Sequence, residues 1–143
     1  MYSILVFIDG TICDERHRVN LVGTSEFNSD DNILNDLPTK GSVECMTSLS
    51  KKYNLIYIGA RPNNYVEITK KWLKKVGFPD SDVYLGKNQR ERMQIAMELK
   101  AKNNFIAGIG DRWDDNELHL AMGCKSIILK EWEPNWDTVL KYL

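Results

Sequence analysis

Four short clusters in the sequence combine glycine with charged residues, a composition suited to binding a phosphate group or a metal ion. Carboxylates supply oxygen ligands for hard cations, and Lys or Arg neutralises phosphate oxygens. Glycine lets the backbone approach an anion closely and present its N–H groups. The clusters are Asp9-Gly10-Thr11, Gly59-Ala60-Arg61, Gly86-Lys87 and Gly110-Asp111-Arg112. Their composition indicates phosphate and metal chemistry.

Each cluster directly follows a short apolar run, which is typical of a buried parallel strand. Segments with helical spacing lie between the runs. One follows Ser42, which we expect to be its N-cap, and another extends from Pro62 to Val76 and stops at Gly77. The alternation predicts a three-layer, Rossmann-like α/β fold with a mostly parallel sheet of about five strands and helices on both faces. In such sheets ligands bind outside the carboxyl ends of the strands, so we expect the clusters to lie together. The apolar runs are residues 4–8, 55–58, 83–85, 105–109 and 126–129.

The segment at about 19–40 breaks this pattern, because it is rich in Gly, Ser, Asn and Asp and has little periodicity. We interpret it as an irregular surface insertion, with a short helix as one option, in a single domain covering residues 1–143. The insertion either lies over the end of the first strand or forms a solvated loop. No large cap domain is expected.

Composition narrows the classes of partner. The chain has 143 residues with 19 Lys and Arg against 20 Asp and Glu, so no overall positive charge attracts nucleic acid. The longest apolar run near the N-terminus is too short to span a membrane, and no leader signature surrounds it. The three cysteines are widely spaced and form no CxxC pair, which predicts reduced thiols in a cytoplasmic protein.

The order of these motifs resembles the haloacid dehalogenase superfamily over nearly the whole chain. Phe7-Ile8-Asp9-Gly10-Thr11 is similar to its first motif, and the segment from Gly110 to Asp115 is similar to its last. Asp14-Glu15-Arg16-His17-Arg18 and Gly59-Ala60-Arg61-Pro62 further resemble its small capless phosphatases, including nucleotidase-like and polynucleotide-phosphatase-like members. The resemblance implies a Mg²⁺-dependent phosphomonoester hydrolase.

Two positions depart from the pattern that this family uses. The first motif normally reads Asp-x-Asp-Gly-Thr, in which the first Asp attacks phosphorus and the second acts as acid and base. Aligned without a gap, Asp9 is the second Asp and Phe7 takes the place of the nucleophile. The second motif normally supplies a Ser or Thr hydroxyl, and Gly59 stands there. Both departures predict impaired catalysis.

A shifted register keeps a nucleophile in the first motif. In that register Asp9 attacks the phosphorus and Thr11 occupies the acid/base position. The intact Asp-Gly-Thr tripeptide favours the ungapped register, in which we expect Phe7 to face the ligand crevice. The shifted register instead requires the carboxylate of Asp9 to lie opposite Asp111 and to be free for in-line attack.

The resemblance assigns the candidate site residues by role. Asp9 and Thr11 are the catalytic candidates. The phosphate-binding candidates are Gly59, Ala60, Arg61 and Lys87. The metal candidates are Asp9, Asp111 and Asp115, with Asp114 as a neighbouring alternative to Asp115.

Several of these residues also have purely structural interpretations. Arg61 could only pair with a carboxylate, Lys87 could be a surface lysine, and His17 with Arg18 fits a solvated turn better than a substrate pocket. We interpret Trp113, Trp132 and Trp136 as packing at the edge of the sheet, with a base-stacking platform as the alternative. The lysines of 70–75 are expected to form the wet face of a helix.

Two functions remain open from sequence. The first is a Mg²⁺-dependent phosphatase acting on a phosphorylated small molecule or nucleotide, with a nucleic-acid end as a further option. The second is a non-catalytic module, a pseudoenzyme that keeps phosphate or metal binding on the same scaffold. In either case Mg²⁺ is the expected cofactor, held weakly because one carboxylate is missing.

Overall fold

The central sheet of the computed structural model, which describes residues 1–143, has five parallel strands. They are β1 (Ser3–Phe7), β4 (Asn54–Gly59), β5 (Val83–Leu85), β6 (Phe105–Gly110) and β7 (Lys125–Ile128). Their order across the sheet is β5-β4-β1-β6-β7, with every neighbouring pair parallel. The predicted sheet is confirmed, and β1 lies at its centre, where both faces are buried.

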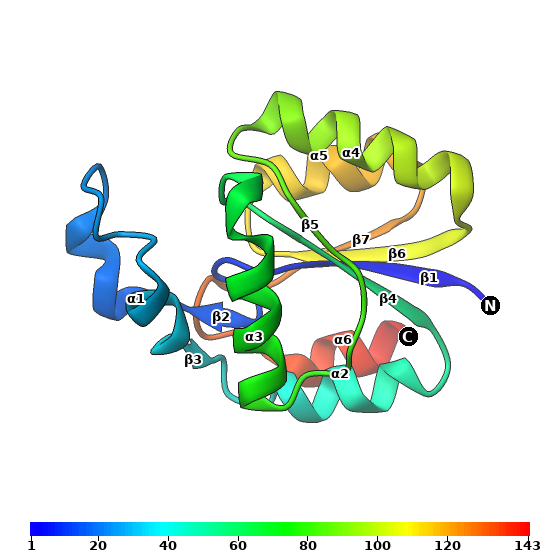
Figure 1. The fold of residues 1–143 in the computed structure, drawn as a ribbon. Coiled ribbons are helices and arrows are strands. Elements are labelled where there is room, and N and C mark those ends of the chain that lie inside the picture. Colours follow the sequence, from blue (N-terminus) through cyan, green and yellow to red (C-terminus); the bar gives the residue numbers. More distant parts are fainter.

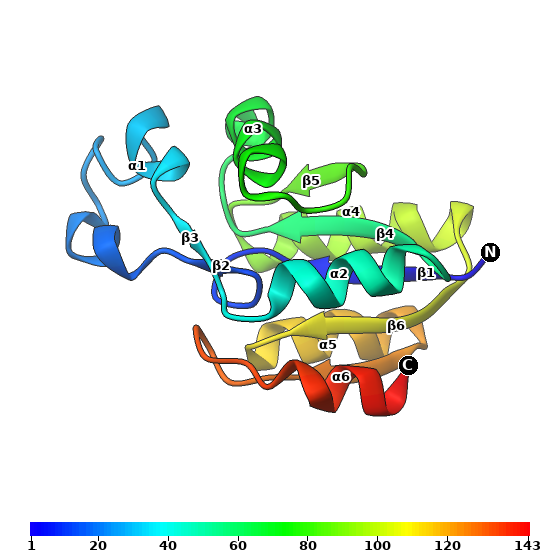
Figure 2. The same cartoon turned by 90° about the horizontal axis from the view of Figure 1, so that it is seen from below.

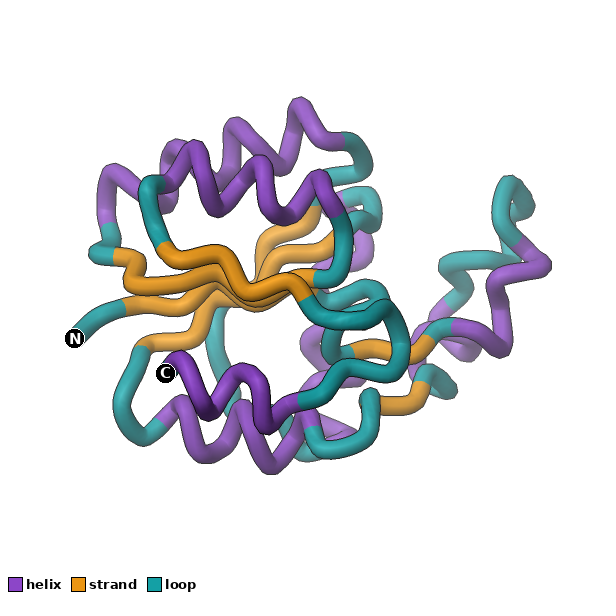
Figure 3. Tube along the Cα trace, turned by 180° about the vertical axis from the view of Figure 1, so that it is seen from behind, coloured by secondary structure: helices purple, strands orange, loops and turns teal.

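Helices cover both faces of the sheet and make three layers (Figure 1). The helices α4 (Gln89–Lys102) and α5 (Trp113–Met122) lie on one face. The opposite face is covered by α2 (Ser42–Ser50) and α6 (Trp136–Tyr142), while α3 (Val66–Val76) packs near the β5 edge. The view from behind shows the same sandwich of strands between helices (Figure 3).

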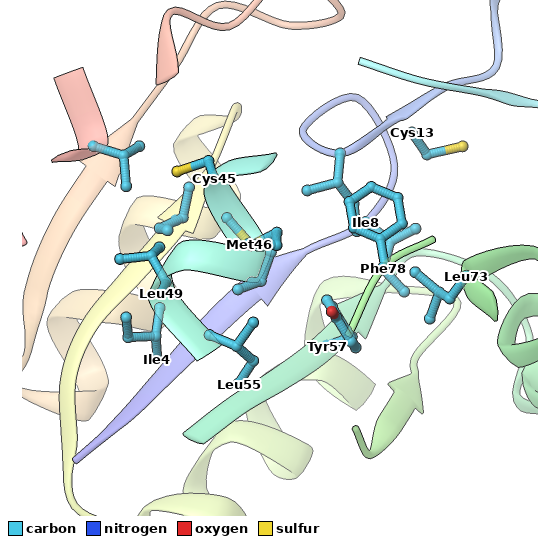
Figure 4. Packing of buried hydrophobic residues seen from close by; sticks show 14 of the residues in the cluster. Ile4, Ile8, Cys13, Cys45, Met46, Leu49, Leu55, Tyr57, Leu73 and Phe78 are labelled. Carbon is cyan, nitrogen blue, oxygen red and sulfur yellow. The ribbon is translucent and has the colours of Figure 1, made fainter. Parts of the chain in front are cut away.

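Side-chain alternation along β1 divides the core between the two faces. Ile4, Val6 and Ile8 belong to the larger cluster beneath α2 and α6, part of which Figure 4 shows. Leu5 and Phe7 point the other way, into a second cluster under α4 and α5. Because successive strand residues face opposite sides of the sheet, each residue of β1 contacts only one of the two helix layers.

The insertion contains more structure than its sequence pattern indicates. The insertion and the residues that lead into it form a 3₁₀ turn at Arg16–Leu21, the short helix α1 (Asp30–Leu34) and an antiparallel pair, β2 (Cys13–Asp14) with β3 (Leu37–Pro38). The insertion projects from the carboxyl-end edge of the sheet, beside α3, in two perpendicular views (Figures 1 and 2). The indole N–H of Trp72 in α3 donates to the carbonyl of Asp36 at 2.8 Å, which attaches the insertion to the body of the fold.

Helix boundaries differ in detail from the expected ones. Gly41, with φ +85°, is the N-cap of α2, and the Ser42 hydroxyl donates back to the Thr39 carbonyl instead of capping. Pro62 precedes a 3₁₀ turn at Asn63–Tyr65, so α3 starts later than predicted, although it ends at Gly77 as expected. The helix α6 was not expected from the sequence. None of the helices combines the length and apolar character needed to cross a membrane.

Candidate functional site at the carboxyl ends of the strands

The carboxyl ends of β1 and β6 bring the first and last clusters into direct contact. The Thr11 hydroxyl donates to Oδ1 of Asp111 at 2.7 Å, although one hundred positions separate the two residues. Gly10 has φ +85°, and a Cβ on it would lie 2.6 Å from Oδ2 of Asp111. Only glycine therefore fits this turn without displacing the Asp111 carboxylate. The sheet brings the two motifs together as the sequence predicts.

The carboxylate of Asp9 is held by β4 and the loop that follows it. Oδ2 accepts from the Ala60 N–H at 2.7 Å, and Oδ1 accepts from Nε of Arg61 at 2.9 Å. Burial alone raises the pKa of Asp9, but the Arg61 charge and the Ala60 N–H outweigh burial and leave this pKa below its usual value. Asp9 is thus an ionised carboxylate in an ion pair, with 14% of its side chain exposed.

Phe7 does not face the ligand crevice. It is 3% exposed and packs with Leu5, Leu118 and Met122 under α4 and α5. The expectation for the ungapped register is therefore not met, because strand alternation turns Phe7 into the core. The shifted register is not met in full either, since the Asp9 carboxylate is already bonded. What remains of the first motif is one carboxylate where the family pattern has two.

Gly59 stands where the family pattern has a hydroxyl, and the surroundings leave little room for one. A Cβ at Gly59 would lie 2.8 Å from Cδ2 of Leu85 and 3.0 Å from Oδ2 of Asp9. Contacts this short require a neighbour to shift. The Ala60 N–H, predicted to bind phosphate, is used within the chain by Asp9.

Arg61 links Asp9 to a second buried carboxylate, Asp36, that the sequence analysis missed. Nη2 of Arg61 lies 3.5 Å from Oδ2 of Asp36, and Nη1 donates to the Thr69 hydroxyl at 2.8 Å. Asp36 also accepts from Nε and Nη2 of Arg18 at 2.8 Å each. The side chains of Asp36, Arg18 and Arg61 are 0%, 1% and 3% exposed. The solvated turn expected for Arg18 is therefore wrong, because this network of charges buries it.

The Asp111 and Asp115 side chains form the opposite half of the site, on β6 and α5. Oδ2 of Asp115 accepts from the N–H groups of Asp111 at 2.9 Å and Arg112 at 3.1 Å. Oδ2 of Asp111 and Oδ1 of Asp115 are buried without a hydrogen-bond partner. Burial raises the pKa of Asp111 to about 7, with the Asp115 charge adding to it and the Thr11 hydroxyl opposing it. Asp115, not the half-exposed Asp114, faces inward.

Arg92 is a buried cation beside this acidic pair that sequence reasoning did not select. Its side chain is 9% exposed; Nη1 donates to the Gly86 carbonyl at 2.8 Å, and Nη2 lies 3.9 Å from Asp114. Its Nε is buried without a partner. Burial lowers the pKa of Arg92, while the charges of Asp115 and Asp114 oppose that effect. Lys87, the predicted phosphate ligand, is close to Arg92 in the sequence, and its side chain is exposed.

Glu15 forms a clamp between the β1 loop and the segment after β7. Oε2 accepts from the Gly10 N–H at 3.3 Å and Oε1 accepts from the Trp132 indole at 3.0 Å, while the Trp132 N–H donates to the Gly10 carbonyl at 2.8 Å. Trp132 adopts φ +65°, an unusual conformation for a bulky residue. Burial raises the pKa of Glu15 to about 7, and the nearby Asp9 charge adds to this rise.

The chain contains no group of three or more His, Cys, Asp and Glu side chains placed to hold a metal ion. Asp9 is paired with Arg61 and does not join the acidic pair in such a group. Mg²⁺, however, commonly uses one or two carboxylates together with water and substrate phosphate. The two unpartnered oxygens of Asp111 and Asp115 fit that smaller donor set.

Comparisons with known proteins agree with this architecture. No family model matches the chain. A Bacillus cereus protein provisionally named a nucleotidase is 35% identical over 71 residues, which cover 48% of this chain and 38% of that protein. The match therefore spans less than two-fifths of the length of the curated relative.

Three solved structures share the fold over almost the whole chain. A haloacid dehalogenase-like family hydrolase from Streptococcus pneumoniae has a TM-score of 0.71 at 13% identity, over 99% of this chain and 98% of that one. A class C acid phosphatase from Bacillus anthracis, solved with tungstate bound, has a TM-score of 0.68 at 21% identity, over 98% and 71%. A chain of an RNA repair complex has a TM-score of 0.69 at 18% identity, over 91% and 42%.

The chain shares the haloacid dehalogenase-like, Rossmann-like fold of these structures, which confirms the fold that the resemblance in the sequence implies. The identities to these structures are low, so they establish the scaffold and leave the chemistry to the residues of this chain.

Proposed function

We propose that the chain binds a phosphate monoester at the carboxyl ends of β1 and β6 and hydrolyses it poorly or not at all. The observation that carries this proposal is the state of the first motif: Phe7 lies in the core, and Asp9 is bonded to Arg61 and Ala60. A covalent phosphatase mechanism needs a free carboxylate for in-line attack and a second group for proton transfer. The first motif of this chain offers one carboxylate, already paired.

Ligand binding is assigned to the half of the site formed by Asp111 and Asp115 after β6 and by Arg92 of α4. The buried Nε of Arg92 lacks a partner and can donate to a phosphate oxygen, with Lys87 as an exposed second cation. Asp111 and Asp115 would hold Mg²⁺ through the oxygens that lack hydrogen-bond partners. Asp9, the third metal ligand predicted from sequence, is left out because Arg61 and Ala60 bind both of its oxygens. When bound, this ion neutralises negative charge on phosphate oxygens. Arg61, enclosed by its own partners, is left to hold Asp9 in place.

An active phosphomonoesterase with Asp9 as nucleophile is the second candidate. It is favoured by the lowered pKa of Asp9, which keeps the carboxylate ionised, and by its remaining exposure. In that mechanism Thr11 would occupy the acid/base position, but its hydroxyl proton is directed at Asp111. The names of the similar proteins, a nucleotidase, an acid phosphatase and a component of an RNA repair complex, support phosphorylated ligands for either candidate.

The deciding experiment measures Mg²⁺-dependent phosphate release from an aryl phosphate and a panel of nucleotides. Asp9→Asn is the matched variant, because it keeps the size of the side chain and removes its charge. We expect the release rate of the native chain to equal that of Asp9→Asn and of a chelator control. Release that depends on both Asp9 and Mg²⁺ would contradict the proposal and establish the second candidate.

A further inference from the structure

The four tryptophans of the chain are held in very different ways. Trp72 and Trp136 are buried, at 0% and 6% exposed, and Trp132 is half-buried with its indole bonded to Glu15. Trp113 is 73% exposed. The ring–ring and cation–ring contacts of the chain all involve other aromatic residues. The expectation that Trp113 packs at the edge of the sheet is therefore wrong.

Trp113 starts α5 at the same edge of the sheet as the candidate phosphate site, directly after the carboxyl end of β6. It is the first residue of α5 and follows Asp111 by two positions, so the Cα atoms of the two residues are at most about 7.6 Å apart. The Asp111 side chain faces inward to Thr11, whereas the indole of Trp113 faces solvent. A ligand whose phosphate lies at the strand ends can therefore place its far end against this ring.

The surroundings of Trp113 select the kind of ligand. Asp114 and Glu117, its neighbours on α5, are exposed acids, and the adjacent Arg112 is paired with Glu131 at 3.0 Å. The exposed acids would repel a polyanionic nucleic-acid strand, but they do not repel an uncharged nucleobase. Indole faces stack well on nucleobases, since every base has a π face.

From this placement we propose that Trp113 is a stacking platform for the base of a mononucleotide whose phosphate occupies the strand-end site. This assignment rests on the proposed phosphate binding and adds a substrate class to it. The first turn of α5 fixes the platform, because Oδ2 of Asp115 accepts from the N–H groups of Asp111 and Arg112 and so holds this turn against the end of β6. The indole is thus presented by a rigid element and not by the insertion.

The test compares the affinity of adenosine monophosphate, ribose 5-phosphate and inorganic phosphate for the native chain and three variants by calorimetry. Trp113→Ala removes the ring and Trp113→Phe keeps a smaller one. Leu120→Ala is the control, because Leu120 is also exposed, at 65%, on the same helix. We expect Trp113→Ala to weaken nucleotide binding roughly 5- to 150-fold. Phosphate and ribose 5-phosphate affinities should stay unchanged, Trp113→Phe should retain most nucleotide affinity, and Leu120→Ala should match the native chain.

Equal nucleotide affinity in Trp113→Ala and the native chain would overturn the platform, and so would an equal loss for ribose 5-phosphate. Quenching of tryptophan fluorescence by adenosine, which has no phosphate, separates the two proposals. If inorganic phosphate fails to bind but adenosine quenches the native chain and not Trp113→Ala, the platform stands and the phosphate site fails. If adenosine leaves the fluorescence of the native chain unchanged, the stacking role of Trp113 is contradicted, whether or not inorganic phosphate binds.

Discussion

The two halves of the strand-end site differ in how completely their charges are paired. On the β4 side Asp9, Arg61, Asp36 and Arg18 form a continuous chain of buried ion pairs. The other half, called the β6 side, consists of Asp111 and Asp115 after β6 together with Arg92 of α4. There Oδ2 of Asp111, Oδ1 of Asp115 and Nε of Arg92 are buried without a hydrogen-bond partner, although Nε of Arg112 lies 3.8 Å from Oδ2 of Asp111. Both halves contain the same types of residue, so composition does not distinguish them.

This difference assigns a role to each half. Buried polar groups without partners cost free energy, and in folded proteins such groups commonly bond an ordered water, an ion or a ligand. Charges that are fully paired within the chain have no need of a ligand and act as structure. The β4 side therefore attaches the insertion to the fold, and the β6 side is the place where a phosphate or a cation would bind.

The largest effect is expected at the paired half. Asp36→Ala leaves the guanidinium groups of Arg18 and Arg61 buried without their shared counter-charge, so it should lower the free energy of unfolding by about 3–5 kcal/mol. Chemical denaturation measures this loss. Asp31→Ala, an exposed acid in the same insertion, is the control and should cost at most about 1 kcal/mol. A loss below about 1 kcal/mol for Asp36→Ala would show that the network does not hold the insertion.

A smaller, pH-dependent effect is expected at the Glu15 clamp. Folding raises the pKa of the Glu15 carboxyl from 4.5 to about 7, so the folded chain binds the proton of this carboxyl more tightly than the unfolded chain does. Stability then falls as pH rises from about 4.5 through about 7, by up to roughly 3 kcal/mol. Glu15→Gln keeps the size of the side chain and cannot titrate, so its unfolding free energy should be flatter over this range. Parallel pH profiles for the native chain and Glu15→Gln would contradict a titrating Glu15.

Sequence reasoning captured the sheet because apolar runs followed by glycine and charge have a strong local signature. It also paired Asp111 with the first motif, since parallel strands end at one edge of a sheet. It could not find Asp36 or Arg92, because each lies outside any motif and acquires its role from burial by distant elements. For Trp113 the sequence predicted the opposite of what the fold shows. Its apolar ring favoured packing at the edge of the sheet, but its position at the start of α5 leaves the ring in solvent.

The account is tested most directly by the affinity of inorganic phosphate for Arg92→Met, measured by calorimetry in the presence of Mg²⁺. Arg90→Met, an exposed arginine on the same helix, is the matched control. Loss of a charge-assisted hydrogen bond predicts a roughly 10- to 150-fold weaker affinity for Arg92→Met and no change for Arg90→Met. Equal phosphate affinity in the native chain and Arg92→Met would contradict a ligand site on the unpaired half.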